Sequence, residues 1–517
     1  MATATTTKKS AFAELGLKGT IEGLKKEIQE LYQADDVPWI IGYSGGKDST
    51  AVLQLTWLAL AELPIEQRRK TVHVISTDTM VENPIVAAWV ARSLDVMRSV
   101  ATKQEMPINP NRLTPSLEDS FWVNLIGKGY PAPRHKFRWC TARLKISPST
   151  SFITGIVKQS GEAILLLGSR KAESQARAKV MARHEKNRAR DRLSPNASLP
   201  STLVYTPIED WTNDDVWIFL MQIKNPWGYN NKDLLGMYQG ASPDGECPLV
   251  VDSTTPSCGD SRFGCWVCTL VDKDKSMTAM IRNDEEKEWM RPLLDFRNAL
   301  DFRNGGAPGE EDSSDRKLRD FRRMSGAIQL FHDRPIPGPY IQEAREDWLR
   351  KLLGAQKIIQ SNGSEDVRNI ELITLRELQE IRRIWVVEKH EMEDKLPRIY
   401  KDVTGEPYPG APLDDNLVLG ESEMELLREA CGEDKLQFEL ARELLSVERQ
   451  QRVQIRRAGL FEKLEKSISR HYYDSREDAV GMARRHAKAR DAASQGETTA
   501  TLETEGEEME NAETNQI

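Results

Sequence analysis

The sequence predicts an α/β fold with a mostly parallel sheet and helices on both faces, followed by an α-helical C-terminal extension. In the first half of the chain, short β-branched runs alternate with helical patterns, which is typical of a parallel sheet. The second half carries long charged stretches with helical spacing. A cysteine-rich loop lies between the two halves.

The chain has 517 residues, enough for two or three domains. No apolar run approaches the roughly 18 residues of a membrane span, and Met1–Ser10 lacks the apolar core of a secretory signal. We therefore expect a cytoplasmic protein with no membrane partner. The predicted divisions are an N-terminal segment with a helix (1–34), an α/β domain (35–245), a cysteine-rich region (246–285), a helical region (286–490) and a disordered acidic tail (491–517).

The net charge of -8 is unevenly distributed. Residues 492–517 contain seven glutamates and no Lys or Arg, so the rest of the chain sums to about -1. A segment rich in Thr and Glu cannot bury enough apolar surface to fold, and we expect it to act as a solubilising tail. A DNA-binding face elsewhere on the chain is therefore compatible with the composition.

A polar, glycine-rich turn at 42–50 is the centre of the α/β domain. The run 37–43 predicts a strand before it and 51–60 a helix after it. Glycines let backbone N–H groups approach an anion, and the helix start adds its positive dipole end. A Gly-Gly turn with a chance lysine is the alternative. The residues expected to hold nucleotide phosphates are Ser44, Gly45, Gly46, Lys47, Asp48, Ser49 and Thr50, with Asp48 holding Lys47 or Mg²⁺.

Three further runs of β-branched and apolar residues predict strands, and polar residues follow two of them directly. Ligands bind at the carboxyl ends of parallel strands, so we expect these polar ends to converge with the glycine-rich turn. The strands are expected at 71–77, 163–167 and 203–206, and the added nucleotide-binding residues are Asp78, Gly168 and Arg170.

A basic segment, 170–192, contains nine Lys or Arg against three Asp or Glu. The simpler interpretation is a solvated helix face followed by a loop. In the alternative, Arg170, Lys171 and Arg177 neutralise ATP phosphates near the strand end. Five of the remaining six cations would then contact a DNA or RNA backbone; they are Arg183, Lys186, Arg188, Arg190 and Arg192.

Four of the six cysteines fall close together, at Cys247, Cys258, Cys265 and Cys268. Disulfides are disfavoured in a cytoplasmic protein, so metal ligation is the leading explanation. The spacing fits an iron–sulfur cluster and a zinc site equally, and unligated structural thiols remain an alternative.

Cys140 stands apart, between Arg138 on one side and Arg143 and Lys145 on the other. Neighbouring cations lower the pKa of a thiol, which suits a sulfur carrier or an additional metal ligand. A buried inert cysteine is an equal alternative.

Several motifs together resemble the phosphoadenylylsulfate reductase-like branch of the ATP pyrophosphatase superfamily. The resemblance implies an adenine nucleotide α hydrolase-like fold, cleavage of ATP between its α and β phosphates, and a 4Fe-4S cluster on the late cysteines, with Cys140 a rival for one ligand position. The matching elements are the turn at 44–49, Asp78-Thr79, Cys140 with Leu144-Lys145 and Pro148, the loop 168–178, the stretch from Pro207 to Trp217, and Gly264-Cys265 with Cys268.

Within that branch, the stretches 121–130 and 245–250 and the overall length resemble the DndC family of DNA phosphorothioation sulfurtransferases. This resemblance implies helical extensions at 285–360 and 421–473 and the replacement of a non-bridging phosphate oxygen of DNA by sulfur. It also implies a cysteine desulfurase as sulfur donor and other Dnd phosphorothioation proteins as partners. In that reaction Lys47 and Asp48, with Mg²⁺, would assist ATP cleavage, and Cys140 would carry the sulfur.

Three alternatives stay open. A sulfonucleotide reductase would use the same domain, but its C-terminal Glu-Cys-Gly-x-His motif is absent, since Cys431 lies in Ala-Cys-Gly-Glu. A tRNA thiolase would use the same adenylation chemistry. A non-catalytic ATP-binding scaffold would need neither the cysteines nor a second substrate.

Overall fold

The computed structural model describes residues 9–186, 188, 190, 192–242, 263–302, 315–331, 334–452, 459–471 and 473–494. The chain divides into two compact units. The first unit comprises Met1–Asp315, Gln342–Glu388 and Asp394–Leu413, and the second comprises Arg316–Ile341, Lys389–Glu393 and Asp414–Ile517. Part of the region predicted as a C-terminal extension thus groups with the α/β part.

A six-stranded sheet forms the centre of the first unit, in the order β3-β2-β1-β4-β6-β5. Five strands are parallel, and β5 is antiparallel to β6. The predicted mostly parallel sheet is confirmed. The strands are β1 Trp39–Gly42, β2 Val72–Thr77, β3 Ile108–Leu113, β4 Ala163–Leu166, β5 Ser194–Pro195 and β6 Thr202–Tyr205.

Two strands, β3 and β5, have no counterpart among the predicted ones. β3 has the sequence Ile-Asn-Pro-Asn-Arg-Leu, which lacks β-branched alternation apart from its first residue. Pro110 cannot donate a ladder hydrogen bond, but β3 is the edge strand, where proline is tolerated. Its pairing with β2 comes from tertiary position, and only sheet topology could have revealed it.

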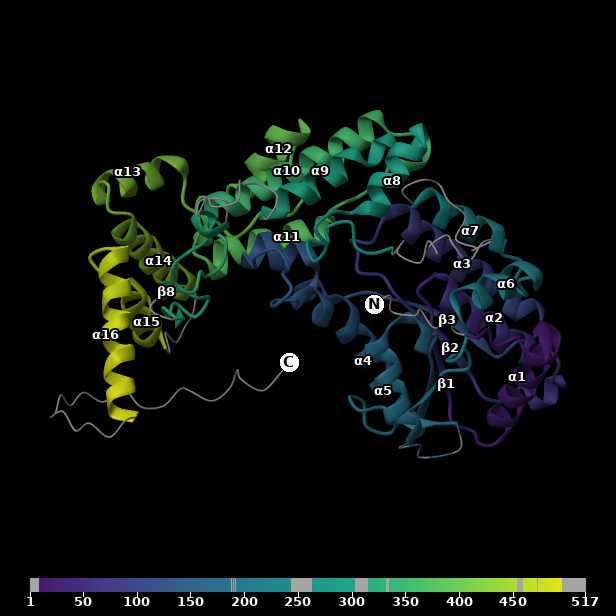
Figure 1. Ribbon diagram of the computed structural model, residues 1–517. Helices are drawn as coiled ribbons and strands as arrows, with labels where there is room; N and C mark the ends of the chain where they lie inside the picture. Colours follow the sequence, from purple (N-terminus) through teal and green to yellow (C-terminus); the bar gives the residue numbers. More distant parts are fainter. Residues whose placement is uncertain are drawn as a thin grey trace, which may run out of the picture. The chain divides into compact units, whose positions relative to one another are not determined.

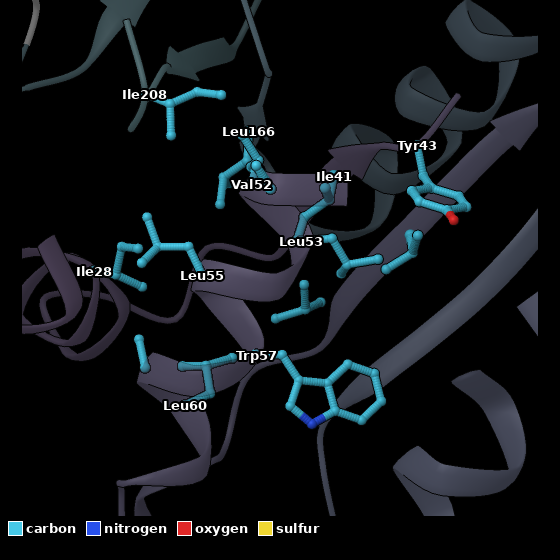
Figure 2. Close-up of a cluster of buried hydrophobic side chains, with 14 of the residues drawn as sticks. Ile28, Ile41, Tyr43, Val52, Leu53, Leu55, Trp57, Leu60, Leu166 and Ile208 are labelled. Atoms are coloured by element: carbon cyan, nitrogen blue, oxygen red, sulfur yellow. The ribbon is translucent and has the colours of Figure 1, made fainter. Parts of the chain in front are cut away.

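Helices cover both faces of the sheet (Figure 1). Trp39 and Ile41 of β1 point to one face, where they join a large apolar cluster with α1, α2, α3 and α6 (Figure 2). Ile40 points to the other face and packs in a smaller cluster with Ile153 of α4. The helices are α1 Gly16–Gln33, α2 Lys47–Ala61, α3 Pro84–Lys103, α4 Ser147–Ser160, α5 Gln175–Lys186, α6 Asn213–Gln222 and α7 Asn231–Gly240.

The stretch 121–130, which carried the resemblance to the phosphorothioation family, lies in an apolar core. Trp122 is buried and packs edge-to-face on Phe296 of α9, and its indole N–H donates to the Leu372 carbonyl at 2.6 Å. Residues 123–128 form a π-helical segment whose described side chains at 123–126 are fully buried. These residues therefore join the sheet domain to later helices: α8 Lys275–Asn283, α9 Arg291–Leu300, α10 Gln342–Asn362, α11 Leu375–Arg383 and α12 Leu396–Thr404.

The second unit is mostly helical, which agrees with the predicted helical C-terminal region. Its interior is rich in ion pairs: Glu443 of α14 faces Arg470 at 3.4 Å, and Arg442 faces Glu393 at 3.2 Å. α16 extends to Ser494, four residues into the predicted tail, and the rest of that tail lies outside the described residues. The elements are β7 Leu330–Phe331, β8 Arg334–Pro335, α13 Glu421–Cys431, α14 Lys435–Arg452, α15 Leu460–His471 and α16 Arg476–Ser494. None of the helices within the described ranges is long and apolar enough to cross a membrane.

Candidate functional site

A cavity of about 810 Å³ opens at the carboxyl ends of the parallel strands. It lies at the end of β1, which has β2 on one side and β4 on the other. The strand order reverses at this point, and parallel sheets bind ligands at such a reversal. The three polar strand ends therefore converge as the sequence predicted. The lining residues include Ser44, Gly46, Lys47, Asp48, Ser76, Thr77, Asp78, Glu82, Arg112, Lys145, Arg170, Glu173, Tyr238 and Phe263.

Backbone geometry shapes the turn at 44–50. Gly45 has φ +75°, and a Cβ there would lie 2.4 Å from the Val90 side chain on α3. A Cβ on Gly168 would lie 2.9 Å from the Asp48 backbone, so the end of β4 closes directly on the turn. Ser49 braces the turn from beneath, because its hydroxyl donates to the Gly46 carbonyl at 3.0 Å and accepts from the Ser44 N–H at 3.2 Å. A side chain at either glycine would displace the turn.

Asp48 holds two cations at the base of the cavity. Its carboxylate accepts from Lys47 Nζ at 3.1 Å and from Arg170 Nε at 2.6 Å. Only 4% of the Arg170 side chain is exposed, and its guanidinium also donates to the Trp211 carbonyl at 3.3 Å. Two positive charges against one negative charge leave the base of the cavity net positive, which suits an anionic ligand.

The predicted nucleotide-binding residues do not all line the cavity. Ser44, Gly46, Lys47, Asp48, Asp78 and Arg170 do. Asp78 forms an ion pair with Arg112, which also lines the cavity. Gly45, Ser49, Thr50 and Gly168 support the turn from behind. Arg177 lies on α5, pairs with Glu173 and is not among the lining residues.

Tyr238 is a site residue that sequence reasoning missed. It lies on α7, and its hydroxyl accepts from the Lys47 backbone N–H at 3.4 Å, while Lys47 Nζ lies 5.6 Å from its ring centre. Burial raises the pKa of Tyr238 to about 12, so the phenol is protonated at neutral pH. Its ring packs edge-to-face on Phe263, next to Gly264-Cys265. No motif marks this tyrosine, and only the return of α7 to the turn brings it there.

The opposite side of the cavity carries Glu82 and Lys145, whose charged groups lie 3.3 Å apart. Cys265 contacts this pair, since its Sγ is 3.8 Å from the Glu82 carboxylate and 3.4 Å from the Thr79 hydroxyl. Burial raises the pKa of the Cys265 thiol to about 12. Burial disfavours the Lys145 ammonium, but nearby Cys265 and Glu82 outweigh it and raise the pKa of Lys145. A thiol thus lies beside the cavity that the glycine-rich turn lines.

The expected lowering of the Cys140 pKa is wrong. Burial is the largest influence and raises the pKa of this thiol, and it outweighs the lowering by hydrogen bonds with Thr141 and by Lys145. The two arginines form hydrogen bonds with other groups: Arg138 donates to the His135 carbonyl, and Arg143 donates to Asn124 and Tyr130. Local sequence placed these cations beside Cys140, but their long side chains reach other partners.

The four-cysteine cluster falls partly outside the described residues, because Cys247 and Cys258 are not among them. Within the described part of the chain, no group of three or more His, Cys, Asp or Glu side chains is arranged to hold a metal ion. Cys265 and Cys268 form one tight turn, with the Cys268 N–H donating to the Cys265 carbonyl at 3.0 Å. Trp266 and Val267 are buried beside them. Two thiols in a turn with apolar cover fit either an iron–sulfur cluster or zinc.

The basic segment 170–192 is held by carboxylates. Lys171 lies 2.5 Å from Glu185 and 2.8 Å from Asp210. Arg190 and Arg192 also form ion pairs, with Asp35 and Glu162 and with Glu27 and Glu30 respectively. Arg188 lies 3.5 Å from Glu209. Three of the five cations expected to contact a nucleic-acid backbone therefore already pair within the first unit.

Comparison with known proteins gives a family match for part of the chain. Residues 38–230 match the model of the phosphoadenosine phosphosulfate reductase domain. An uncharacterised protein of Methanocaldococcus jannaschii is 27% identical over 200 residues, which is 39% of this chain and 35% of that protein. The chain thus spans about a third of the length of the curated relative it matches.

Two solved structures are similar at low identity. The phosphoadenylyl-sulfate reductase of Candida auris in a phosphate complex is 15% identical, with a TM-score of 0.26, over 44% of this chain and 95% of that one. The U34-tRNA thiolase NcsA of Methanococcus maripaludis with its 4Fe-4S cluster is 12% identical, with a TM-score of 0.27, over 57% and 83%. We draw no argument from scores this low. The family match covers residues 38–230, which are similar to a phosphoadenosine phosphosulfate reductase domain.

Proposed function

We propose that this chain is an ATP-dependent sulfurtransferase that adenylates a DNA backbone phosphate and replaces a non-bridging oxygen with sulfur. One observation carries the proposal: a single cavity is lined by the cationic turn at one side and, at the other, by Lys145 and by Glu82, whose carboxylate contacts Cys265. An anionic nucleotide and a sulfur nucleophile would meet there. DNA as acceptor rests on the resemblance of 121–130 and 245–250 to the phosphorothioation family.

In the first step Lys47 and Arg170 would hold the β and γ phosphates of ATP, with Asp48 fixing both cations or ligating Mg²⁺. A DNA phosphate oxygen attacks the α phosphorus, the bond between the α phosphorus and its bridging oxygen breaks, and pyrophosphate leaves with the electron pair. The net positive base of the cavity stabilises the charge that develops on this leaving group. Tyr238 would hold the Lys47 backbone, and with it the turn, in position.

In the second step a sulfur nucleophile attacks the activated DNA phosphorus and AMP leaves. The terminal sulfur of a persulfide on Cys140, charged by a cysteine desulfurase, is the candidate nucleophile. A second thiolate then attacks the S–S bond, which leaves the phosphorothioate and a disulfide that an external thiol must reduce. A 4Fe-4S cluster on Cys247, Cys258, Cys265 and Cys268 would, when bound, supply an electron or sulfide store beside this site.

A sulfonucleotide reductase is the second candidate, because the matched family model is that of such a domain. Its C-terminal cysteine motif is absent, and Cys431 is the last residue of α13 in the second unit. A reductase would also need no macromolecular acceptor. A tRNA thiolase, the third candidate, would differ only in its acceptor.

The deciding experiment supplies purified protein, ATP, Mg²⁺, duplex DNA, a cysteine desulfurase with cysteine, and a thiol reductant. Pyrophosphate and AMP release are followed, and digested DNA is analysed by mass spectrometry for phosphorothioate dinucleotides. We expect Lys47→Ala to lower AMP release by about 10²- to 10³-fold, as for other losses of charge stabilisation. Lys179→Ala, an exposed lysine on α5, is the matched control and should react as wild type.

Other outcomes assign the other functions. Sulfite released from adenylylsulfate would identify a reductase, and thiolated nucleosides formed only with tRNA would identify a thiolase. Intact sulfur incorporation in cells that carry Lys47→Ala and Asp48→Ala would instead indicate a non-catalytic ATP-binding scaffold. For the cysteines, iron and acid-labile sulfide with visible absorbance support the cluster, whereas stoichiometric zinc without that absorbance contradicts it.

A further inference from the structure

The segment 131–161 is the second basic block of the chain. It contains no Asp or Glu in a protein whose net charge is -8. Cations without acidic neighbours in sequence attract polyanions, and this effect weakens with salt. The six cations are Arg134, Lys136, Arg138, Arg143, Lys145 and Lys158.

Part of this block is a small hairpin at 134–138. The Arg134 N–H donates to the Phe137 carbonyl at 3.1 Å, and the Phe137 N–H donates back to Arg134 at 2.8 Å. His135 and Lys136 thus form a two-residue tip. Such a tight turn projects its side chains outward.

The base of the hairpin is anchored. Trp139 is buried and stacks on Phe121 at 5.3 Å, and its indole N–H donates to the Pro131 carbonyl at 3.0 Å. The Thr269 hydroxyl donates to the Pro133 carbonyl at 2.6 Å. A rigid base presents the tip without the entropy cost that a mobile loop would pay on binding.

The tip itself is exposed from Arg134 to Arg138. Phe137 is 38% exposed, although its ring lies nearly parallel to Tyr130 with centres 6.2 Å apart. Arg134 forms an ion pair with Asp315, whereas the Arg138 guanidinium donates to the His135 carbonyl and lies 3.3 Å from the His135 ring nitrogen Nδ1. An exposed aromatic ring flanked by cations is the combination that binds nucleic acid, since bases stack on rings and phosphates pair with cations.

We propose that the hairpin 134–138 is the surface that docks DNA, with Lys136 and Arg138 contacting phosphates and Phe137 packing against an adjacent base or sugar. This inference rests on the proposed function and names its docking surface. The chain runs from the hairpin directly through Trp139 to Cys140. Docking there would bring a phosphodiester close to Cys140, the candidate sulfur carrier.

The test measures binding of a short fluorescein-labelled DNA duplex by anisotropy across a salt series, with no ATP present. Lys136→Ala with Arg138→Ala should weaken binding by about tenfold or more and reduce the slope of log K against log salt by about 1.8. Phe137→Ala should weaken binding by about fivefold or more with an unchanged slope. Arg92→Ala with Lys103→Ala on α3 is the matched control, one exposed Arg and one exposed Lys, and should bind as wild type.

Hairpin variants that bind DNA with wild-type affinity and salt slope would overturn the proposal, and so would an equal loss in the α3 control. Urea unfolding of each variant shows whether it is folded, so that a lost affinity is not a lost fold. Binding of a labelled RNA duplex but not of DNA would also overturn it. DNA binding that depends on the hairpin, without phosphorothioate formation, would contradict the proposed function and still support the docking surface.

Discussion

The first unit contains two basic segments that look alike in sequence and differ in the structure. The segment 170–192 carries nine cations, but Lys171, Arg190 and Arg192 each form ion pairs with carboxylates from other elements. The hairpin 134–138 presents an exposed aromatic ring and cations on a fixed base. The difference teaches that a run of like charge predicts a surface only when the fold places no opposite charge against it.

The largest expected effect concerns the base of the hairpin. Trp139→Ala should lower the free energy of unfolding by about 3–5 kcal/mol, because it removes a buried aromatic ring that stacks on Phe121. His135→Ala at the exposed tip should change it by less than about 0.5 kcal/mol. Urea denaturation followed by far-ultraviolet circular dichroism measures both free energies of unfolding, because this signal does not rely on tryptophan fluorescence. Equal losses would show that the base and tip are not distinct.

The next effect concerns the start of the other segment. Arg170→Ala should lower the free energy of unfolding by about 3 kcal/mol, the low end for breaking a buried pair, because Asp48 retains Lys47. Arg177→Ala, whose exposed pair with Glu173 joins α5 to the short 3₁₀ turn before it, should cost less than about 0.5 kcal/mol. Denaturant midpoints at matched slope compare the two. If Arg177→Ala costs as much stability as Arg170→Ala, the buried pair at the cavity and the exposed pair on α5 do not differ in strength.

The smallest effect concerns the paired cations that end this segment. Arg190→Ala and Arg192→Ala should each cost about 0.2–1 kcal/mol of stability, since their partners are partly exposed. Neither should change the salt slope of DNA binding, whereas Lys136→Ala should reduce that slope by about 0.9 without loss of stability. A drop in slope for Arg190→Ala would mean that its ion pairs open to bind DNA.

Much of the fold could be predicted locally. The β-branched run at 71–77, the apolar run at 163–167 and the turn at 44–50 carry their signals in a few adjacent residues, and the structure has strands and a turn there. The edge strand β3 could not be predicted in this way, because its pairing with β2 depends on where α3 returns the chain. Local signals identify an element when its own residues decide it.

The site residues also divide into those that local sequence predicts and those that only the fold reveals. Lys47, Asp48 and Arg170 could be proposed from the turn and a strand end, and the structure brings all three to one cavity. Tyr238 could not be found, because no spacing relates α7 to the turn. The effect of the cations near Cys140 was misjudged, since burial, which raises the pKa of this thiol, follows from packing rather than from sequence neighbours.

The sequence by itself determined the parallel α/β class, the phosphate-type turn and the residues able to supply charge and sulfur, because glycine placement, periodicity and side-chain chemistry are local properties. Only the tertiary structure decided which cations are free to meet a ligand. Carboxylates near α1, β4 and α6 reach the segment 170–192. At the hairpin Asp315 pairs with Arg134, whereas the Arg138 guanidinium binds His135. Coulomb attraction acts through space over a few ångströms, and distance along the chain does not measure it.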